Sequence, residues 1–313
     1  MNIKCDPDVF KSDSERNFFI SCMVSHNKSH SLDVGNIDEL LEHHNLSDSE
    51  RNLMLRLAVH SAYSNYSLKI TISNTHTGNG IFPCEQLNDI LSRKAVIILE
   101  NEFSDARFIE SVIKSQNKDY LLKTKDISWE FCGAGGCGEI PKHIRSKVEK
   151  MKNLKRILVV HDSDKLHPDS EISEIQRKII EQAKEYDIFC YTLEKREIEN
   201  YIPDEIIYNI DWTRKKIIES FSKLSSTQKD FFDYKLGFKK RGGYKKKNDT
   251  SLNGLYEDID DEVYNEIKNG FGKEISDAAY NEHVRISKDD FSLRCDNINH
   301  EFFKICEAIE KIL

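Results

Sequence analysis

The chain contains 313 residues and carries a formal net charge of −8 at pH 7. This length allows two domains, or one domain with appendages, while the acidic balance excludes a protein coated in basic surface. No apolar run approaches the ~20 residues of a membrane helix, and the N-terminal sequence MNIKCDPDVF lacks the layout of a signal peptide. We therefore expect a soluble, cytoplasmic protein that makes no contact with a membrane.

The first predicted unit is a mixed α+β region that covers residues 1–92. Two helical patterns meet near Ser47, where Glu50 three positions later indicates a capping box. The segment SLKITIS then alternates as a strand does, and CEQLNDILSR returns to helical spacing. No chemistry is evident in this region.

A second unit, residues 93–208, begins with a strand that ends in acids. From Ala95 onward strands and helices alternate, which predicts a parallel α/β sheet. The apolar run AVIIL is followed by Glu100, Glu102 and Asp105. Because ligands of open α/β sheets bind outside the carboxyl ends of the strands, these acids are candidate site residues.

The next strand leads into a glycine-rich turn and a helix in the segment ISWEFCGAGGCGEIPKHI. Glycines allow close backbone approach and positive φ, and the helix N-terminus behind them is suited to a phosphate. The turn fits neither GxGxxG nor a Walker loop, and a tight strand-to-helix turn explains the glycines equally well. Cys132 and Cys137 flank it without partner ligands at zinc spacing.

A second acidic strand end follows in RILVVHDSDK, where a buried strand stops at Asp162 and Asp164. Two carboxylates in one space repel each other unless a cation or a shared proton lies between them. The alternative is a surface turn whose side chains cap the next helix, which spans SEISEIQRKIIEQAKEY. The strand IFCYTL then brings Glu199 to the same carboxyl edge of the sheet.

The third predicted unit, residues 209–313, is mostly helical and highly charged. It contains the basic stretch FKKRGGYKKKN, whose local positive charge suits the phosphate backbone of a nucleic acid. A solvated loop is the alternative explanation of such a stretch. Its basic residues are Lys239, Lys240, Arg241, Lys245, Lys246 and Lys247.

In this order the motifs resemble the TOPRIM domain, and specifically the nuclease version found in OLD-family and related bacterial antiviral effectors. AVIILENEFSD matches the acidic first motif through Glu100 and Asp105, and HDSD matches the Asp-x-Asp motif. GAGGCGEI matches the second-strand element, and LEKREIENYIP matches the closing Arg-x-x-Glu-Asn-Tyr segment. Asn101 stands where the family usually has glycine, so Glu102 competes with Glu100 for the first acid; we favour Glu100, which directly follows the strand.

The resemblance covers about residues 93–208. It implies a Rossmann-like parallel TOPRIM sheet, flanked by the mixed N-terminal and the mostly helical C-terminal regions. It also implies a metal-dependent nuclease that cleaves DNA or RNA, including tRNA, with Mg²⁺ or Mn²⁺ as cofactor. The expected metal ligands are Glu100, Asp162 and Asp164, and the expected catalytic set adds Asp105 and Glu199.

In the resembling effectors such nucleases are restrained, which implies an antiphage-defence role here, with a separate ATPase or sensor protein as partner. The composition permits a homo-oligomer. One alternative is a primase- or topoisomerase-like enzyme, for which Tyr201 and Tyr208 are poorly placed nucleophiles. Another is a non-catalytic subunit that binds nucleic acid or a partner, and whose acids hold a structural cation.

Overall fold

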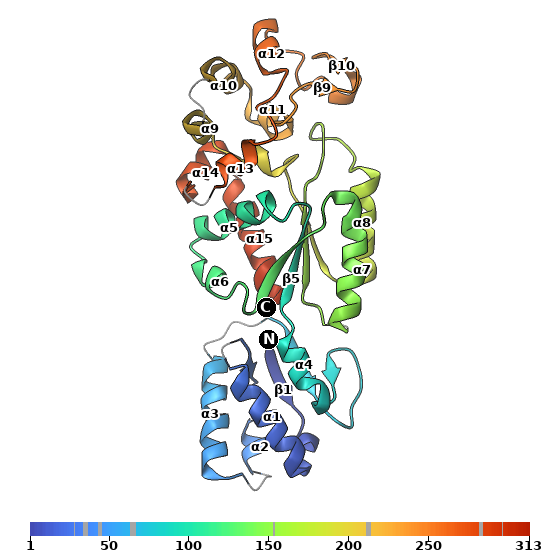
Figure 1. Ribbon diagram of the computed structural model, residues 1–313, viewed down its shortest axis with the longest axis vertical. Coiled ribbons are helices and arrows are strands. Elements are labelled where there is room, and N and C mark those ends of the chain that lie inside the picture. Colours follow the sequence, from blue (N-terminus) through green and yellow to red (C-terminus); the bar gives the residue numbers. More distant parts are fainter. Residues whose placement is uncertain are drawn as a thin grey trace.

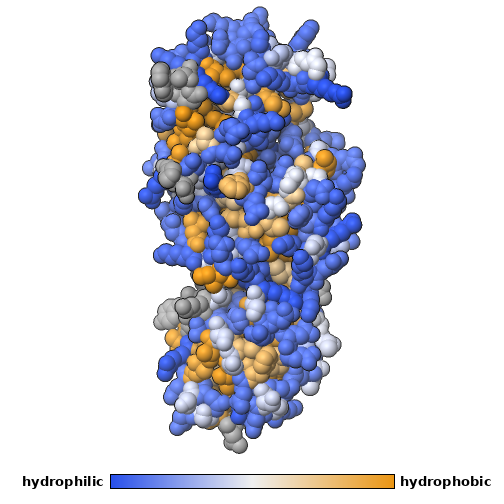
Figure 2. Space-filling view, viewed as in Figure 1, coloured by the Kyte–Doolittle hydropathy of each residue, from blue (hydrophilic) through white to orange (hydrophobic). Residues whose placement is uncertain are grey.

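Figure 1 shows an elongated molecule in which three parts are stacked along the longest axis, with both chain ends between the lower two. This computed structural model describes residues 1–27, 29–33, 37–42, 46–62, 67–152, 154–210, 214–281, 284–295 and 297–313. Most of the surface in Figure 2 is hydrophilic, and apolar side chains form separate patches on it. Among the described residues, none of the helices is both long and apolar enough to cross a membrane.

The N-terminal part is a small parallel sheet with helices around it. Its 4-stranded sheet has the order β2-β1-β3-β4, and every pair in it is parallel. The sequence indicated only β3, because β2 and β4 have two residues each and are too short to show alternation. The elements are β1 (Asn2–Cys5), α1 (Asp13–Ser25), β2 (Ser31–Leu32), α2 (Ile37–Glu42), α3 (Asp48–Ala62), β3 (Lys69–Ile72), β4 (Ile81–Phe82) and α4 (Leu87–Ser92).

The central part is the α/β unit with a parallel sheet that the sequence predicted. Its 4-stranded sheet has the order β6-β5-β7-β8, again with every pair parallel. The helix after the DSDK loop starts at Glu174 because Ser173 caps it by accepting from the Gln176 amide. The elements are β5 (Ala95–Leu99), α5 (Ser104–Ser115), α6 (Asp119–Lys123), β6 (Trp129–Gly133), α7 (Ile140–Met151), β7 (Ile157–His161), α8 (Glu174–Glu185) and β8 (Phe189–Thr192).

Both faces of the central sheet are buried, which is why β5 and β7 are apolar without alternation. Ile97 and Leu158 belong to the core shared with α5, whereas Ile98 and Val159 belong to the core shared with α7 and α8. The second core continues into the N-terminal part. Because successive side chains of a strand point to opposite faces, one apolar strand serves two cores.

The C-terminal part is mostly helical and returns to the central sheet with its last helix. That helix, red in Figure 1, packs beside α5 and against β7 and β8. The elements are α9 (Asp204–Ile210), α10 (Lys215–Ser222), α11 (Ser226–Phe231), β9 (Lys239–Lys240), β10 (Gly243–Tyr244), α12 (Asp261–Ile267), α13 (Ile275–Ala279), α14 (Lys288–Arg294) and α15 (Ile298–Ile312).

A buried arginine joins these parts at the amino edge of the central sheet. The Arg156 guanidinium donates to the carbonyls of Ile312 (3.2 Å), Ser128 (3.1 Å) and Arg93. Carbonyls at a helix C-terminus carry partial negative charge, so the cation suits the end of α15.

Candidate functional site

The strand order creates a crevice at the carboxyl edge of the central sheet. β5 and β7 are neighbours, yet α5 packs with one core and α8 with the other, on opposite faces of the sheet. The loops that follow the two strands therefore diverge, and such a switch point is where open α/β sheets bind ligands. Glu100 follows β5, and Asp162 follows β7.

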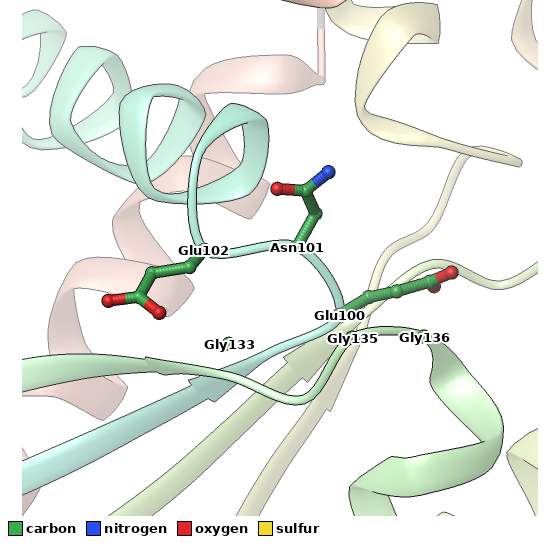
Figure 3. A pocket seen from close by; sticks show the side chains of 6 residues that line it. All are labelled: Glu100, Asn101, Glu102, Gly133, Gly135 and Gly136. Carbon is green, nitrogen blue, oxygen red and sulfur yellow. The ribbon is translucent and has the colours of Figure 1, made fainter.

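The glycine-rich turn after β6 closes over the end of β5 and forms one wall of the crevice. The amides of Gly135 and Gly136 donate to the Glu100 carbonyl at 3.0 and 3.1 Å, with positive φ at both glycines. Figure 3 shows the Glu100 side chain extended above these two residues. They line an open pocket of about 460 Å³ with Glu100, Asn101, Glu102 and Gly133.

Glu100 and Glu102 point in different directions, which separates the two candidates for the first acid. In Figure 3 the exposed Glu102 side chain extends away from Glu100. Its backbone lies against Gly133, where an added Cβ would come within 2.5 Å of the Glu102 Cβ. Burial and the charges of Asp105 and Asp164 raise the pKa of Glu100. Glu100 is thus the acid that faces the other carboxylates.

Asp105 organises the loop after β5 as well as adding negative charge to the crevice. Its carboxylate accepts from the Asn101 amide at 2.8 Å and from the Ser104 hydroxyl at 3.1 Å. Burial nevertheless raises its pKa. The role that follows most directly from these bonds is to hold the Glu100 loop in shape.

The DSD loop after β7 is fixed to the loop after β8. The amides of Ser163 and Asp164 donate to the Arg196 carbonyl at 3.1 and 3.0 Å, and the Ser163 hydroxyl donates to the Lys195 carbonyl at 2.7 Å. Asp164 has a φ of +53°, which Asp tolerates better than most residues. These bonds fix the backbone that carries Asp162 and Asp164. Ser173, and neither aspartate, caps α8, although the Asp164 carboxylate accepts from the Gln176 side chain of that helix.

Charge repulsion is concentrated at Asp162. Burial, followed by the charges of Asp105 and Glu199, raises its pKa well above the ordinary range. Burial and Glu197 likewise raise the pKa of Asp164, although a hydrogen bond from Gln176 opposes that shift. Carboxylates that perturb one another in this way lie in a shared space that favours a cation or a proton.

Lys235 supplies one cation, and the sequence did not indicate it. Its ammonium lies 3.1 Å from Oε1 of Glu199 and 3.5 Å from Oε2 of Glu197. Burial opposes the charge of Lys235, but the carboxylates of Glu199, Glu197 and Asp162 outweigh it and raise the lysine pKa. The only sequence signal was indirect, since so many acids at one sheet edge require a positive partner.

Glu199 is the most deeply buried acid of the crevice, with 0% of its side chain exposed. Neither of its carboxylate oxygens accepts a hydrogen bond from the described residues, and neither does Oε2 of Glu197. Burial raises the pKa of Glu199 to about 7, although the charge of Lys235 opposes this. For Glu197 the charges of Arg196 and Lys235 outweigh burial and lower the pKa.

The rest of the Arg-x-x-Glu-Asn-Tyr segment fastens the sheet to the C-terminal part. Arg196 donates to Asp233 at 2.9 Å. The Asn200 side-chain amide donates to the backbone carbonyl of Lys229 in α11 at 2.7 Å and to that of Phe232, just after this helix, at 2.8 Å. The Tyr201 hydroxyl is buried and donates to Glu301 at 2.7 Å. This tyrosine therefore acts in packing and is not accessible as a nucleophile.

The basic stretch forms a hairpin, β9–β10, beyond the carboxyl edge of the central sheet (Figure 1). Lys239 and Arg241 are exposed, as are Lys240, which pairs with Asp249, and Lys246. Lys247 is half-buried and lies 2.8 Å from Asp261. Lys245 is half-buried, and burial and the charge of Arg196 lower its pKa.

The donor set of the crevice fits a hard divalent cation, because Mg²⁺ and Mn²⁺ prefer carboxylate oxygens. Both carboxylate oxygens of Glu199 and Oε2 of Glu197 accept no hydrogen bond within the described residues, although the Lys235 ammonium lies beside them, and this capacity supports the fit. As placed, however, no three acidic, histidine or cysteine side chains of the described residues converge closely enough to hold a metal ion. A bound metal would require the carboxylates to draw together.

The raised carboxyl pKa values predict that stability falls as pH rises. Folding raises the pKa of Glu199 from an ordinary 4.5 to about 7. Its contribution to the free energy of unfolding is therefore fully present below pH 4.5 and is lost as pH rises through 7. The raised pKa of Asp162 acts in the same direction.

Between about pH 5 and pH 8 we expect the metal-free protein to lose on the order of 3 kcal/mol of unfolding free energy from Glu199. Urea unfolding measures this loss, which the variant Glu199→Gln would largely remove. An equally steep pH dependence in that variant would contradict the assignment.

No protein-family model matches the chain, and no curated protein or solved structure matches it either. The chemistry of the crevice is therefore inferred from its own residues.

Proposed function

We propose that the chain is a metal-dependent nuclease with a TOPRIM-type α/β core that acts in the cytoplasm. The observation that carries this proposal is that Glu100, Asp162, Asp164 and Glu199 lie near enough to one another at the switch point of the sheet for burial and nearby carboxylates to raise their pKa values, with Lys235 beside Glu199. Strongly perturbed carboxyl groups in a crevice are typical of catalytic sites. The motif order described above supports the same conclusion.

In this proposal Glu100, Asp162 and Asp164 would hold Mg²⁺ or Mn²⁺, which when bound would lower the pKa of water and neutralise charge on the phosphate. Glu100 is also placed to accept the proton of the attacking water. The oxygen of that water adds to phosphorus, one P–O ester bond breaks, and the leaving oxygen takes up a proton. Glu199, with a pKa of about 7, is suited to exchange a proton near neutral pH.

Lys235 has two roles in this proposal. Before substrate binds, its ammonium compensates the buried Glu197 and Glu199. About a third of its side chain is exposed, so the same ammonium is accessible to a phosphate at the mouth of the crevice. Fixed positive charge stabilises the negative charge that builds up on phosphorus oxygens during cleavage.

The β9–β10 hairpin supplies affinity for the nucleic-acid backbone, because contacts to phosphates position a substrate without reading its sequence. The combined variant Lys239→Gln/Lys240→Gln/Arg241→Gln should weaken DNA and RNA binding. The slope of log affinity against log salt should fall by about 2 to 3.

Fluorescence anisotropy over a range of salt concentrations measures this slope. A matched control changes three exposed lysines outside the hairpin, Lys4, Lys11 and Lys184, to glutamine. An equal loss in the control would show that only net charge matters.

The decisive experiment incubates the purified protein with plasmid DNA and with total tRNA, each with Mg²⁺, Mn²⁺ or EDTA. Cleavage that requires the metal and is abolished by EDTA supports the nuclease and identifies its substrate. Binding of nucleic acid without cleavage, together with no Mn²⁺ binding in calorimetry, would overturn it.

The second candidate is a non-catalytic subunit that binds nucleic acid. It is favoured by the Lys235 contacts, because an ion-pair network can account for the acids without a metal. For such a subunit, changing Asp162 would leave every measurable activity intact.

We further propose that the nuclease is a toxic effector of antiphage defence, held inactive by a separate ATPase or sensor protein or by assembly into a homo-oligomer. Support comes from the motif resemblance. Expression from a tightly controlled promoter tests it: growth should stop with the wild-type chain and continue with Asp162→Ala.

A further inference from the structure

The segment that carries Lys235 contains Gly237, which lies directly against Gly270 in the turn after α12. Gly237 and Gly270 both adopt left-handed backbone conformations, with φ of +61° and +65°. A Cβ on Gly237 would lie 2.5 Å from the Gly270 amide nitrogen, and a Cβ on Gly270 would lie 2.6 Å from that of Gly237. These distances are shorter than any side chain tolerates, so only glycine fits at both positions.

The contact acts directly on the backbone of Lys235. A Cβ on Gly270 would also come within 2.8 Å of the Lys235 carbonyl carbon. The Lys235 carbonyl accepts from the Gly272 amide at 3.1 Å, and the neighbouring Tyr234 carbonyl accepts from the Phe271 amide at 2.6 Å. The turn after α12 therefore fixes the position of the Lys235 backbone relative to the carboxyl edge of the central sheet.

The other end of the segment is attached to the acidic loops. Asp233 accepts from the Leu236 amide at 2.7 Å through one carboxylate oxygen and from Arg196 at 2.9 Å through the other. The Arg196 carbonyl in turn holds the DSD loop. Lys235 thus lies between two fixed points, one on the sheet and one at the glycine contact.

We propose that Gly237 and Gly270 are positioning residues that set the Lys235 ammonium against Glu199 and Glu197. The placement of the lysine follows from the contacts alone, whereas its consequence for cleavage rests on the proposed function. Any side chain at either glycine pushes the two turns apart and withdraws the ammonium from the acids. Displacement of a catalytic group by about 1 Å is enough to cost on the order of 100-fold in rate.

The test compares Gly270→Ala and Gly237→Ala with a matched control. Gly254 has a similar φ of +74°, but the nearest atom to its added Cβ is 3.7 Å away. Gly254→Ala therefore introduces the same backbone strain without the collision. Gly272→Ala is a second control from the same turn as Gly270, since its Cβ would meet nothing within 4 Å. If Gly270→Ala does not fold, Gly237→Ala carries the test alone.

The first measurement does not need cleavage. The reaction of Lys235 with acetic anhydride is followed by mass spectrometry, on samples that circular dichroism shows to be folded. An ion-paired ammonium with a raised pKa reacts slowly. We expect several-fold faster labelling in Gly270→Ala and Gly237→Ala and an unchanged rate in Gly254→Ala. Equal rates in all variants would overturn the inference, whether or not the protein cuts nucleic acid.

The second measurement is a double-mutant comparison of metal-dependent cleavage. Gly270→Ala should lower the rate about 100-fold in the wild-type background and have almost no further effect in the Lys235→Ala background, because the two changes remove the same interaction. A full additional loss in that background would show that the glycine acts independently of the lysine. A wild-type protein that neither cuts nucleic acid nor binds Mn²⁺ refutes the proposed function and leaves the labelling result to decide the placement of Lys235.

Discussion

Asp162→Asn should abolish metal-dependent cleavage and at the same time stabilise the metal-free protein. The activity loss should be at least about 100-fold, since even residues one contact removed from a metal are worth up to that much. Stability should rise because burial and the charges of Asp105 and Glu199 raise the pKa of Asp162, so its ionised form opposes folding. We expect a gain of about 1 to 3 kcal/mol in unfolding free energy near pH 8.

Urea unfolding and cleavage kinetics on the same preparations measure both effects. The matched control is Glu185→Gln, an exposed acid at the C-terminal end of α8, and it should change neither quantity appreciably. A variant at Asp162 that loses activity only because it loses stability would contradict the proposed role. A stable variant that keeps full cleavage would do so more directly.

Lys235→Met should lower both stability and activity. Removing the ammonium leaves Glu199 and Glu197 without their nearest cation. Breaking a fully buried pair costs ~3–5 kcal/mol, and we expect about 2 to 3 here because Lys235 reaches solvent. Cleavage should fall by about 100-fold or more if the same ammonium stabilises the scissile phosphate.

The double variant Lys235→Met/Glu199→Gln separates these two effects. Neutralising the buried acid removes the unpaired charge, so the double variant should regain most of the lost unfolding free energy, as measured by urea unfolding. Its cleavage rate should stay low. Lys239→Met serves as the control, because this lysine is exposed on the hairpin and should affect binding alone. Recovery of cleavage in the double variant would mean that Lys235 has only a structural role.

The sequence predicted the two central strands of the central sheet well because both are continuous apolar runs. β5 and β7 lie where AVIIL and ILVV indicated, and both are buried on both faces. The sequence did not predict the parallel sheet of the N-terminal part, because β2 and β4 have two residues each and so show no recognisable apolar pattern. Parallel pairing also joins strands distant in sequence, such as β1 and β3.

For the candidate site, the sequence indicated the acids but not what surrounds them. Glu100, Asp162 and Asp164 follow strands, so strand order alone places them together. Lys235 reaches the crevice from a turn of the C-terminal part, and no local pattern encodes such a contact. The basic stretch pointed to the lysines of the hairpin as candidate site residues, whereas Lys235, which contacts the acids, lies just before that stretch in the sequence.

The packing of α15 on the central sheet has a consequence for the order in which the protein is made. Glu100, Asp162 and Glu199 leave the ribosome before Lys235, and α15 follows later still. Until α15 emerges, the sheet face that contains Leu158 and Val160 is covered by α5 but lacks the contacts that α15 makes with β7 and β8. If the chain is the nuclease proposed above, we expect it to become active only after its last helix has left the ribosome.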